Sequence, residues 1–293
     1  MYIVVLVLLL PTAASVYYFG YNALLTIAIT VGTAVLTEFL CRKIRRKPFT
    51  MDGSAVITGL LLALTLPPLI PPWMAALGAF FAIAVVKELF GGLGHNIFNP
   101  VLAGRAFLQV SFPIPMATWV APTGFSLDAV TSASPLSEAL PQSVGDWYFY
   151  RDLLLGNTSG SIGETMALAI IAGGLLLIAL RIIDWRTPFS YIVTVAVLCL
   201  VLGQDVIFHL LSGGLMLGAF FMATDYVTAP LTRRGRVIFG LGAGILTVLI
   251  RLYGGMPEGV CFSILIMNAL TPLIDRYAGH KPYGYKKGAK SEA

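Results

Sequence analysis

Long runs of apolar residues, interrupted by short polar stretches, extend along almost the whole chain of 293 residues. Each run is about 20 residues long, which is the length that an α-helix needs to cross about 30 Å of hydrocarbon. The pattern therefore predicts an all-α polytopic membrane protein with about ten transmembrane helices. Their expected ranges are 2–18, 21–41, 54–69, 72–90, 95–112, 162–183, 187–203, 206–224, 236–253 and 259–275.

Two pairs of similar segments indicate an internal repeat. Residues 89–92 (Leu-Phe-Gly-Gly), at the end of the fourth span, resemble residues 252–255 (Leu-Tyr-Gly-Gly) at the end of the ninth. Residues 59–65 resemble residues 218–224 in the same way. The paired segments are five spans apart, and because five is odd, two five-helix halves would be inverted relative to each other. The alternative is that glycine pairs and small residues are common wherever membrane helices pack.

The composition and the charge both support a membrane protein. Hydrophobic residues make up 57% of the chain and charged residues only 11%, whereas a soluble domain carries about 25% charged residues. The net charge of +5 arises in short loops, which indicates membrane orientation rather than nucleic-acid binding. The basic clusters are Arg42–Lys47, Arg181 with Arg186, Arg233–Arg236, and the tail from Arg276 onward.

With ten spans, all four basic clusters fall on one side of the membrane, which is predicted to be the cytoplasmic side. Both termini are then expected to be cytoplasmic, in the cell (inner) membrane, with the segment after the fifth span outside. The expected parts are a first transmembrane repeat (1–112), an extracytoplasmic segment (113–160), a second transmembrane repeat (161–277) and a basic cytoplasmic tail (278–293).

Prolines and polar residues interrupt several of the spans. The interruptions lie at Thr65–Pro68, at Gly94–Pro100, from Ala223 to Pro230 and at Met256–Gly259. Irregular backbone at membrane depth is tolerated where protein or a cavity covers it. Because the interruptions occupy corresponding places in the two halves, they indicate a central site near the middle of the membrane.

The string Asp128-Ala-Val-Thr131-Ser132-Ala-Ser134-Pro-Leu136 lies in the expected outer segment. By itself it is a hydroxyl-rich turn before a proline. It also resembles the flavin-attachment motif of the RnfD/NqrB family, in which the last hydroxyl carries FMN through a phosphoester. The resemblance implies covalent FMN at Ser134, where the family residue is usually threonine. Asp128 belongs to the same motif, and Thr131 and Ser132 are the alternative attachment points.

The resemblance covers nearly the whole chain in order. Residues 90–107 are similar to the family's signature of glycines and asparagines followed by Asn-Pro and Gly-Arg. Further similar segments are 52–68, 160–165, 221–230 and 251–275. Because the chain is short and lacks a long amino-terminal extension, it resembles the D subunit (RnfD) of the ion-translocating electron transport complex Rnf more than NqrB.

The resemblance implies a urea-transporter-like fold with two inverted five-helix repeats. It also implies a flavin-carrying membrane subunit of an Rnf-type complex, which couples electron transfer between ferredoxin and NAD to translocation of Na⁺ or H⁺. Such a subunit is not catalytic alone, because the protein positions and tunes its cofactors. The expected partners are other Rnf subunits, including a second FMN-bearing subunit and iron–sulfur subunits, and not nucleic acid.

A second, noncovalent flavin (riboflavin or a related flavin) is also implied, in the membrane part near Asn96 and Asn99. Their i, i+3 spacing would place two amides on one side of a helix opening, where they could bond flavin carbonyls and ring nitrogens. The alternative, which stays open beside the first, is that they cap the helix start. Asp225, beside Thr224 at the end of the eighth span, is the acidic residue expected at a cation or a flavin.

Arg105 is expected inside the fifth span, where a buried arginine is a functional hypothesis by default. Its expected partner is Asp225 or Glu88, and the alternative role is to steady a flavin anion. Lys87 and Glu88 are expected to extend toward water from the end of the fourth span. Glu164 is expected to open the sixth span, where a carboxylate at a helix start is electrostatically favourable.

Two other functions stay open at the level of sequence. A solute channel or transporter of urea-transporter-like fold would use the broken helices, although it has no need of the 113–160 segment and its motif. A scaffold subunit without covalent flavin is the other alternative, and the serine at position 134 is its support. No metal site is expected, because the three cysteines are isolated and the histidines share no ligand spacing.

Overall fold

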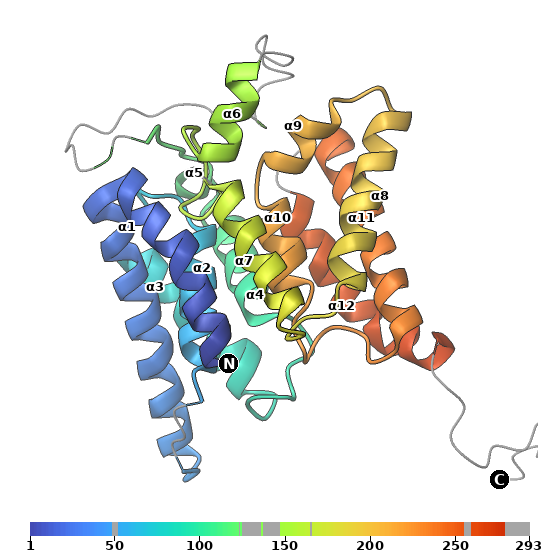
Figure 1. Ribbon diagram of the computed structural model, residues 1–293. Helices are drawn as coiled ribbons and strands as arrows, with labels where there is room; N and C mark the ends of the chain where they lie inside the picture. The colour runs from blue at the N-terminus through green and yellow to red at the C-terminus, as the bar shows by residue number, and fades with distance from the viewer. Residues whose placement is uncertain are drawn as a thin grey trace, which may run out of the picture.

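Helices form most of the structure, and no strand occurs among the described residues. The computed structural model describes residues 1–48, 52–122, 124, 136, 147–164, 166–254 and 259–278 (Figure 1). The elements are α1 (Tyr2–Ile44), α2 (Ser54–Thr65), α3 (Pro72–Phe80), the π-helix η1 (Phe81–Glu88), α4 (Pro100–Ser111), α5 (Pro113–Met116), α6 (Trp147–Leu155), α7 (Ala167–Ala179), α8 (Arg186–Val201), α9 (Val206–Leu211), α10 (Leu215–Leu217), the π-helix η2 (Gly218–Met222), α11 (Arg233–Tyr253) and α12 (Gly259–Ala278). The all-helical fold class expected from the sequence is confirmed.

The helix α1 is bent back on itself at Gly20. The φ of 56° and ψ of −133° at this residue are not helical, and glycine adopts them without the steric penalty that a Cβ would bring. The two arms of α1, residues 2–19 and 21–44, match the first two predicted spans. They run in opposite directions in Figure 1.

Several predicted spans are shorter than expected or are divided. α2 ends at Thr65, because Leu66 is extended and two prolines follow it. α4 begins at Pro100, five residues later than predicted, since proline favours the first helical position. The eighth predicted span is divided into α9, α10 and η2, and the chain leaves helical geometry between α9 and α10 at Gly213, whose φ is 68°.

Three helices are long and apolar enough to cross a membrane, namely Tyr2–Ile44, Arg233–Tyr253 and Gly259–Ala278. Shorter apolar helices are Ser54–Thr65, Ala167–Ala179 and Arg186–Val201. Large apolar side chains such as Leu6, Leu175 and Leu200 are exposed on the outer surfaces of these helices. An exposed apolar surface of this extent is unfavourable in water and favourable in lipid, so the protein is a membrane protein.

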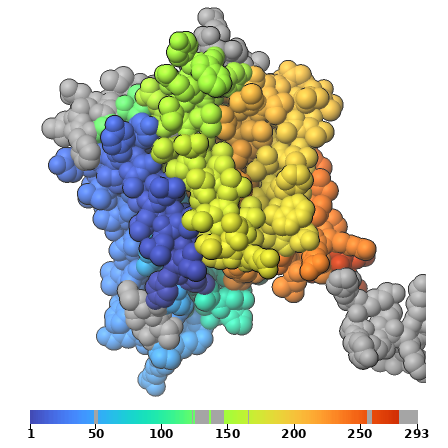
Figure 2. Space-filling model, in the orientation of Figure 1, coloured from blue at the N-terminus to red at the C-terminus, as the bar shows by residue number. Residues whose placement is uncertain are grey.

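Small residues let the helices approach one another closely. A methyl group at Gly59 of α2 would lie 2.7 Å from the Cα of Val31 in α1, so only glycine fits there. Between α8 and α11, a methyl group at Gly244 would lie 2.6 Å from the Cβ of Thr194. Gly173 brings α7 close to Val7 in the first arm of α1, and Figure 2 shows these two helices side by side.

The ends of the helices form two opposite faces of the molecule (Figure 1). The N-terminus, the end of α1, the turn between α7 and α8, the start of α11 and the end of α12 lie on the lower face in that view. α5, α6 and α9 lie on the upper face. The segments with the first three basic clusters, and the end of α12 with which the fourth begins, therefore share one face, and the described part of the 113–160 segment lies on the other.

Candidate cofactor site

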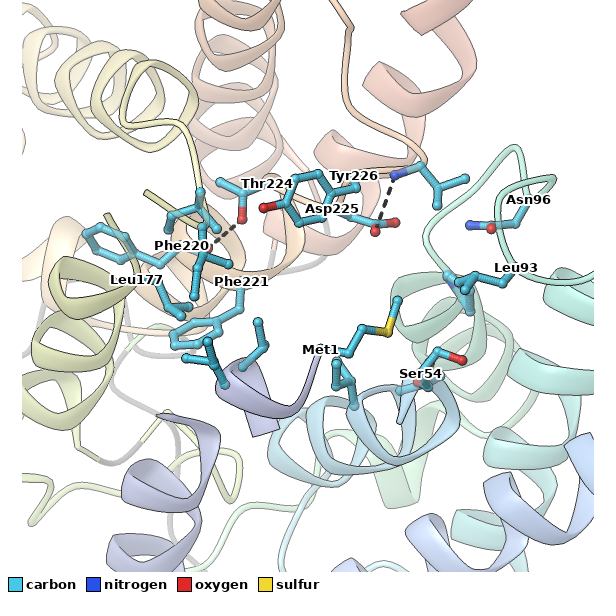
Figure 3. Close-up of a pocket in the computed structure, with 18 of the residues that line it drawn as sticks. Met1, Ser54, Leu93, Asn96, Leu177, Phe220, Phe221, Thr224, Asp225 and Tyr226 are labelled. Carbon is cyan, nitrogen blue, oxygen red and sulfur yellow. Dashed lines mark hydrogen bonds between the residues drawn. The ribbon is translucent and has the colours of Figure 1, made fainter. Parts of the chain in front are cut away.

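A cavity of about 370 Å³ lies on the side of the lower face, between α1, α2, the loop before α4, and the end of α7 (Figure 3). η2 and the segment that follows it close the remaining side. Apolar side chains form most of the walls, among them Leu93, Leu177, Phe220 and Phe221. Its polar lining residues are Ser54, Thr58, Lys87, Asn96, Thr224 and Asp225. An apolar pocket of this size with a few converging polar groups is typical of a small-molecule or cofactor site.

Asn96 and Asn99 have different roles, although the sequence paired them. Asn96 lines the cavity, and its amide nitrogen donates to the carbonyl of Phe98 at 3.0 Å. The side chain of Asn99 accepts from the backbone N–H of Val101 at 3.0 Å and so caps the start of α4. Capping is therefore confirmed for Asn99, and the position of Asn96 agrees with contact to a cofactor.

Asp225 follows η2 and borders the cavity from the side opposite α2 (Figure 3). Its Oδ2 accepts from the hydroxyl of Thr228 at 3.1 Å, and its Oδ1 accepts from the backbone N–H of Val227 at 3.5 Å. The hydroxyl of Thr224 donates to the carbonyl of Phe220 at 2.6 Å rather than to Asp225. The bonds from Thr228 and Val227 hold the carboxylate of Asp225 at the cavity edge, where it can accept a hydrogen bond from a ligand.

Asn99 also joins the two halves of the chain. Its backbone N–H donates to Oδ1 of Asn268 in α12 at 3.2 Å, and its amide nitrogen donates to the carbonyl of Met222 at 3.2 Å. The amide of Asn268 donates in turn to the carbonyl of Thr228 at 3.3 Å. Asn268 was not among the predicted site residues, because a single asparagine inside an apolar span gives no spacing signal.

A buried network of charges lies at the α2 end of the cavity, and it contradicts the expectation for Lys87 and Glu88. Lys87 is only 2% exposed, and its Nζ lies 2.7 Å from Oε1 of Glu38 and 2.6 Å from the hydroxyl of Ser54. Arg42 binds the same Glu38 oxygen at 3.0 Å. The expected extension toward water fails because α1 brings a carboxylate directly to the lysine.

Glu88 is part of the same network and is 3% exposed. Its Oε2 lies 3.1 Å from Arg45, and its Oε1 lies 3.9 Å from Arg42. Asp52, just before α2, receives hydrogen bonds from Arg42 and from Ser54. Burial opposes ionisation of Asp52, but these bonds and the charge of Lys87 outweigh it and lower the pKa of the carboxyl.

Arg105 pairs with Glu164 and not with Asp225 or Glu88, so both expected partners were wrong. Its Nη1 lies 3.9 Å from Oε1 of Glu164, and both side chains are buried. Six residues of helix separate Arg105 from Asn99, which carries it about 9 Å along α4, away from the cavity. Glu164 does not open a helix either, since α7 begins at Ala167. The pair lines a much smaller cavity with Thr65, Gly214 and Cys261.

Four of the predicted site residues, Asp128, Thr131, Ser132 and Ser134, lie outside the described residues. Leu136, at the end of the motif, is described, and its Cδ1 would lie 2.6 Å from a methyl group at Gly213. The guanidinium of Arg251 lies on the same side of Gly213 and donates to the carbonyls of His209 at 2.6 Å and Ser212 at 3.1 Å. Leu136 and Arg251 therefore both lie beside the break between α9 and α10.

Comparison with known proteins gives the family. The family model described as "NQR2, RnfD, RnfE family" matches residues 1–284. The chain belongs to this family. The resemblance argued from the flavin-attachment string and from the Asn-Pro and Gly-Arg signature is thereby confirmed.

Relatives within the NQR2, RnfD, RnfE family match over nearly their full lengths. The D subunit of the proton-translocating ferredoxin:NAD(+) oxidoreductase complex of Clostridium ljungdahlii is 48% identical, over 95% of this chain and 89% of the relative. The D subunit of the Na(+)-translocating ferredoxin:NAD(+) oxidoreductase complex of Acetobacterium woodii is 48% identical, over 99% of this chain and 91% of the relative. The D subunit of the ion-translocating oxidoreductase complex of Stutzerimonas stutzeri is 40% identical, over 94% and 89%.

Proposed function

We propose that this member of the family is the flavin-carrying membrane subunit of an Rnf-type complex. The complex would couple electron transfer between ferredoxin and NAD to translocation of Na⁺ or H⁺ across the cell membrane. The observation that carries this proposal is the match, over 95% and 99% of this chain, to the D subunits of two ferredoxin:NAD(+) oxidoreductase complexes, each 48% identical to it. One of these relatives is named for protons and the other for Na⁺, so the proposal includes both ions.

The proposed transmembrane arrangement is ten spans in two inverted five-helix repeats, with both termini cytoplasmic. Its support is the course of the chain between the two faces in Figure 1, together with the basic segments that share one face. The two π-helices, η1 and η2, occur in the fourth and eighth predicted spans, and π-helical turns are frequent at functional sites. The proposed arrangement places the flavin-attachment motif on the extracytoplasmic side.

Covalent FMN is proposed at Ser134, through a phosphoester with the serine hydroxyl. The proposal rests on the resemblance of residues 128–136 to the family's attachment motif and on the family match over residues 1–284.

The cavity of 370 Å³ is the proposed site of a second, noncovalent flavin. Its chemistry fits an isoalloxazine ring, since Phe220 and Phe221 offer flat apolar surfaces. The amide of Asn96 offers both a donor and an acceptor for the ring carbonyls and nitrogens, and Asp225 offers an acceptor. Lys87, which is paired with Glu38, lines the opposite end. The bound flavin would supply one-electron transfer, and these residues would orient it and exclude water.

An in-gel fluorescence experiment tests the covalent part. The full chain is expressed together with its flavin transferase, denatured in SDS and examined under ultraviolet light. A fluorescent band at the mass of the chain is expected for the natural protein and is expected to disappear in Ser134→Ala. The absence of the band from the natural protein would contradict the covalent flavin, whereas a band that persists in Ser134→Ala would move the attachment to Thr131 or Ser132.

The noncovalent part is tested on the natively purified protein. Flavin released by mild denaturation is measured for the natural protein, for Asn96→Ala and for Asp225→Asn. We expect at least a tenfold loss of released flavin in each variant, because each removes a directed hydrogen bond in a desolvated site. Gln109→Ala is the control, since Gln109 lies on α4 and does not line the cavity. Equal flavin in all four proteins would contradict the site.

A further inference from the structure

A second large cavity, of about 560 Å³, lies where the turn between α7 and α8 meets the start of α11. Four arginines line it, and the lining also contains one carboxylate, that of Asp184. This cavity is called the basic cavity below, and its arginines are Arg181, Arg186, Arg233 and Arg236. The excess of positive charge in a concave site favours an anion.

Two of the four arginines are held in fixed positions by Asp184. Nη1 of Arg186 binds its two oxygens at 3.2 and 3.0 Å, and Nη1 of Arg236 binds Oδ2 at 2.7 Å. Nε of Arg236 also donates to the carbonyl of Pro230 at 3.1 Å, and the ring of Trp185 lies 5.2 Å from Arg186. Burial opposes ionisation of Asp184, but these hydrogen bonds outweigh it and lower the pKa of the carboxyl. The two guanidinium groups are thus preorganised at neutral pH.

The other two arginines, Arg181 and Arg233, are exposed and make no hydrogen bond or ion pair through their side chains within the described part of the chain. Arg181 has a φ of 57°, in the left-handed region. Glycine usually occupies such a position after a helix, and Arg181 directly follows Leu180, the C-cap of α7. An arginine in this conformation places a charged side chain at the cavity mouth at some cost in backbone energy.

The surroundings of the basic cavity are those of a lipid headgroup region. Ile178, Ile182 and Ile183 form its apolar wall. The neighbouring surface of α7 exposes Leu175 and Leu176, each with at least half of its surface accessible. Trp185 and Tyr226 line the cavity and are also exposed, and these aromatic residues are enriched where a membrane meets water. A ligand here can have a charged end in the cavity and apolar chains along α7.

We propose that the basic cavity binds the phosphate headgroup of an anionic phospholipid, with phosphatidylglycerol as the simplest example. Arginine pairs bind phosphate oxygens in two-point geometry, and basic pockets between membrane helices take anionic headgroups. The basic cavity shares Ile182, Ile183 and Tyr226 with the 370 Å³ cavity. Because Tyr226 follows Asp225 in the chain, a lipid bound there stabilises the segment that carries Asp225.

The test is native mass spectrometry of the full chain in detergent, with phosphatidylglycerol or phosphatidylcholine of the same acyl chains added. The cavity variant is Arg181→Gln with Arg233→Gln. The matched control is Arg46→Gln with Arg234→Gln, which removes the same charge from the turn after α1 and the first turn of α11, outside the cavity lining. We expect phosphatidylglycerol to bind the cavity variant at least about tenfold more weakly than the natural protein, while the control keeps its affinity.

Three results would overturn the proposal. They are an equal loss in both variants, equal binding of the two lipids, and occupation by inorganic phosphate with no specific phosphatidylglycerol adduct. Retained lipid binding together with loss of a co-purified subunit from the cavity variant would also overturn it, in favour of a protein interface. If the cavity variant does not fold, arginine-selective labelling of the natural protein tests whether lipid occupies the basic cavity. Phosphatidylglycerol must then protect Arg181 and Arg233, and phosphatidylcholine must not.

The lipid site is independent of the covalent flavin, so the two proposals fail separately. The in-gel fluorescence of the cavity variant is expected to equal that of the natural protein. A cavity variant that loses lipid binding and keeps its fluorescence supports the lipid site. This conclusion does not depend on whether the proposed flavin sites are correct.

Discussion

Asn99 and Asn268 are joined by a hydrogen bond of 3.2 Å, although 169 residues separate them in the chain. The bond ties the start of α4 to the interior of α12. Both side chains are buried, so the amides replace water as partners for the irregular backbone at 222 and 228. The two asparagines therefore hold the broken segments of the two halves in register.

Replacement of Asn268 by alanine is expected to destabilise the fold by about 1–3 kcal/mol, because it leaves the buried N–H of Asn99 without its partner, whereas the carbonyl of Thr228 keeps the hydroxyl of Thr271 as a donor at 3.0 Å. The measurement is thermal unfolding of the purified chain in detergent. Asn22→Ala, at an exposed asparagine of α1, is the control. It should unfold at the same temperature as the natural protein. An Asn268→Ala protein as stable as this control would contradict the bridge.

Removal of one partner from the Arg105–Glu164 pair should be among the most damaging changes. Glu164→Ala leaves the arginine charge buried, which costs about 3–5 kcal/mol when a buried pair is broken. The double variant Arg105→Met with Glu164→Leu should recover much of that loss, since neither charge is then buried. A double-mutant cycle measured by thermal unfolding checks this, and strict additivity of the two single changes would show that the residues do not interact.

Removal of Lys87 is expected to destabilise the fold less than removal of Glu164. Lys87→Met removes one partner of Glu38, but Arg42 still binds that carboxylate at 3.0 Å. The expected destabilisation is about 1–3 kcal/mol, and the second change Glu38→Gln should reduce it. The same unfolding measurement applies, and a lack of rescue by Glu38→Gln would mean that the lysine does not serve to neutralise this carboxylate.

Two glycines of α11 offer a matched test of helix packing. A methyl group at Gly240 would overlap the hydroxyl of Ser190 and the backbone of α8, whereas one at Gly242 would meet the flexible end of Met267. Gly240→Ala should therefore destabilise the protein, because backbone atoms cannot move aside. Gly242→Ala should be neutral or stabilising, since alanine is the better helix former by about 1 kcal/mol. The opposite order of unfolding temperatures would contradict the α8–α11 contact.

The sequence predicted much of the fold through local signals. The break in α1 at Gly20 and the start of α12 at Gly259 agree with predicted limits to within a few residues, whereas α2 ends at Thr65, four residues before its predicted limit. These positions are set by glycine, by proline and by apolar length. The division of the eighth span into three short helices was not predicted, because its apolar residues continue without a gap and the packing of neighbouring helices decides its geometry.

The candidate site was predicted only in part. Asn96 and Asp225 line one cavity, as the broken spans suggested. The partner of Arg105 was wrong, because the sequence does not show that residues before α7 reach the upper part of α4. Asn268 and Glu38 were missed for the same reason, since each acts through a contact between distant segments. The predictions for Asp128, Thr131, Ser132 and Ser134 lie outside the described residues.

The most direct measurement of the central claim uses everted membrane vesicles from cells whose only copy of this chain carries Ser134→Ala. Reduction of NAD⁺ by reduced ferredoxin is followed together with uptake of Na⁺ or H⁺, at equal amounts of the natural and variant chain. A flavin relay through this protein predicts that the variant loses at least 90% of both activities, about a tenfold change that corresponds to about 1.4 kcal/mol in the barrier. Full activity in vesicles whose chain carries no covalent flavin would contradict it.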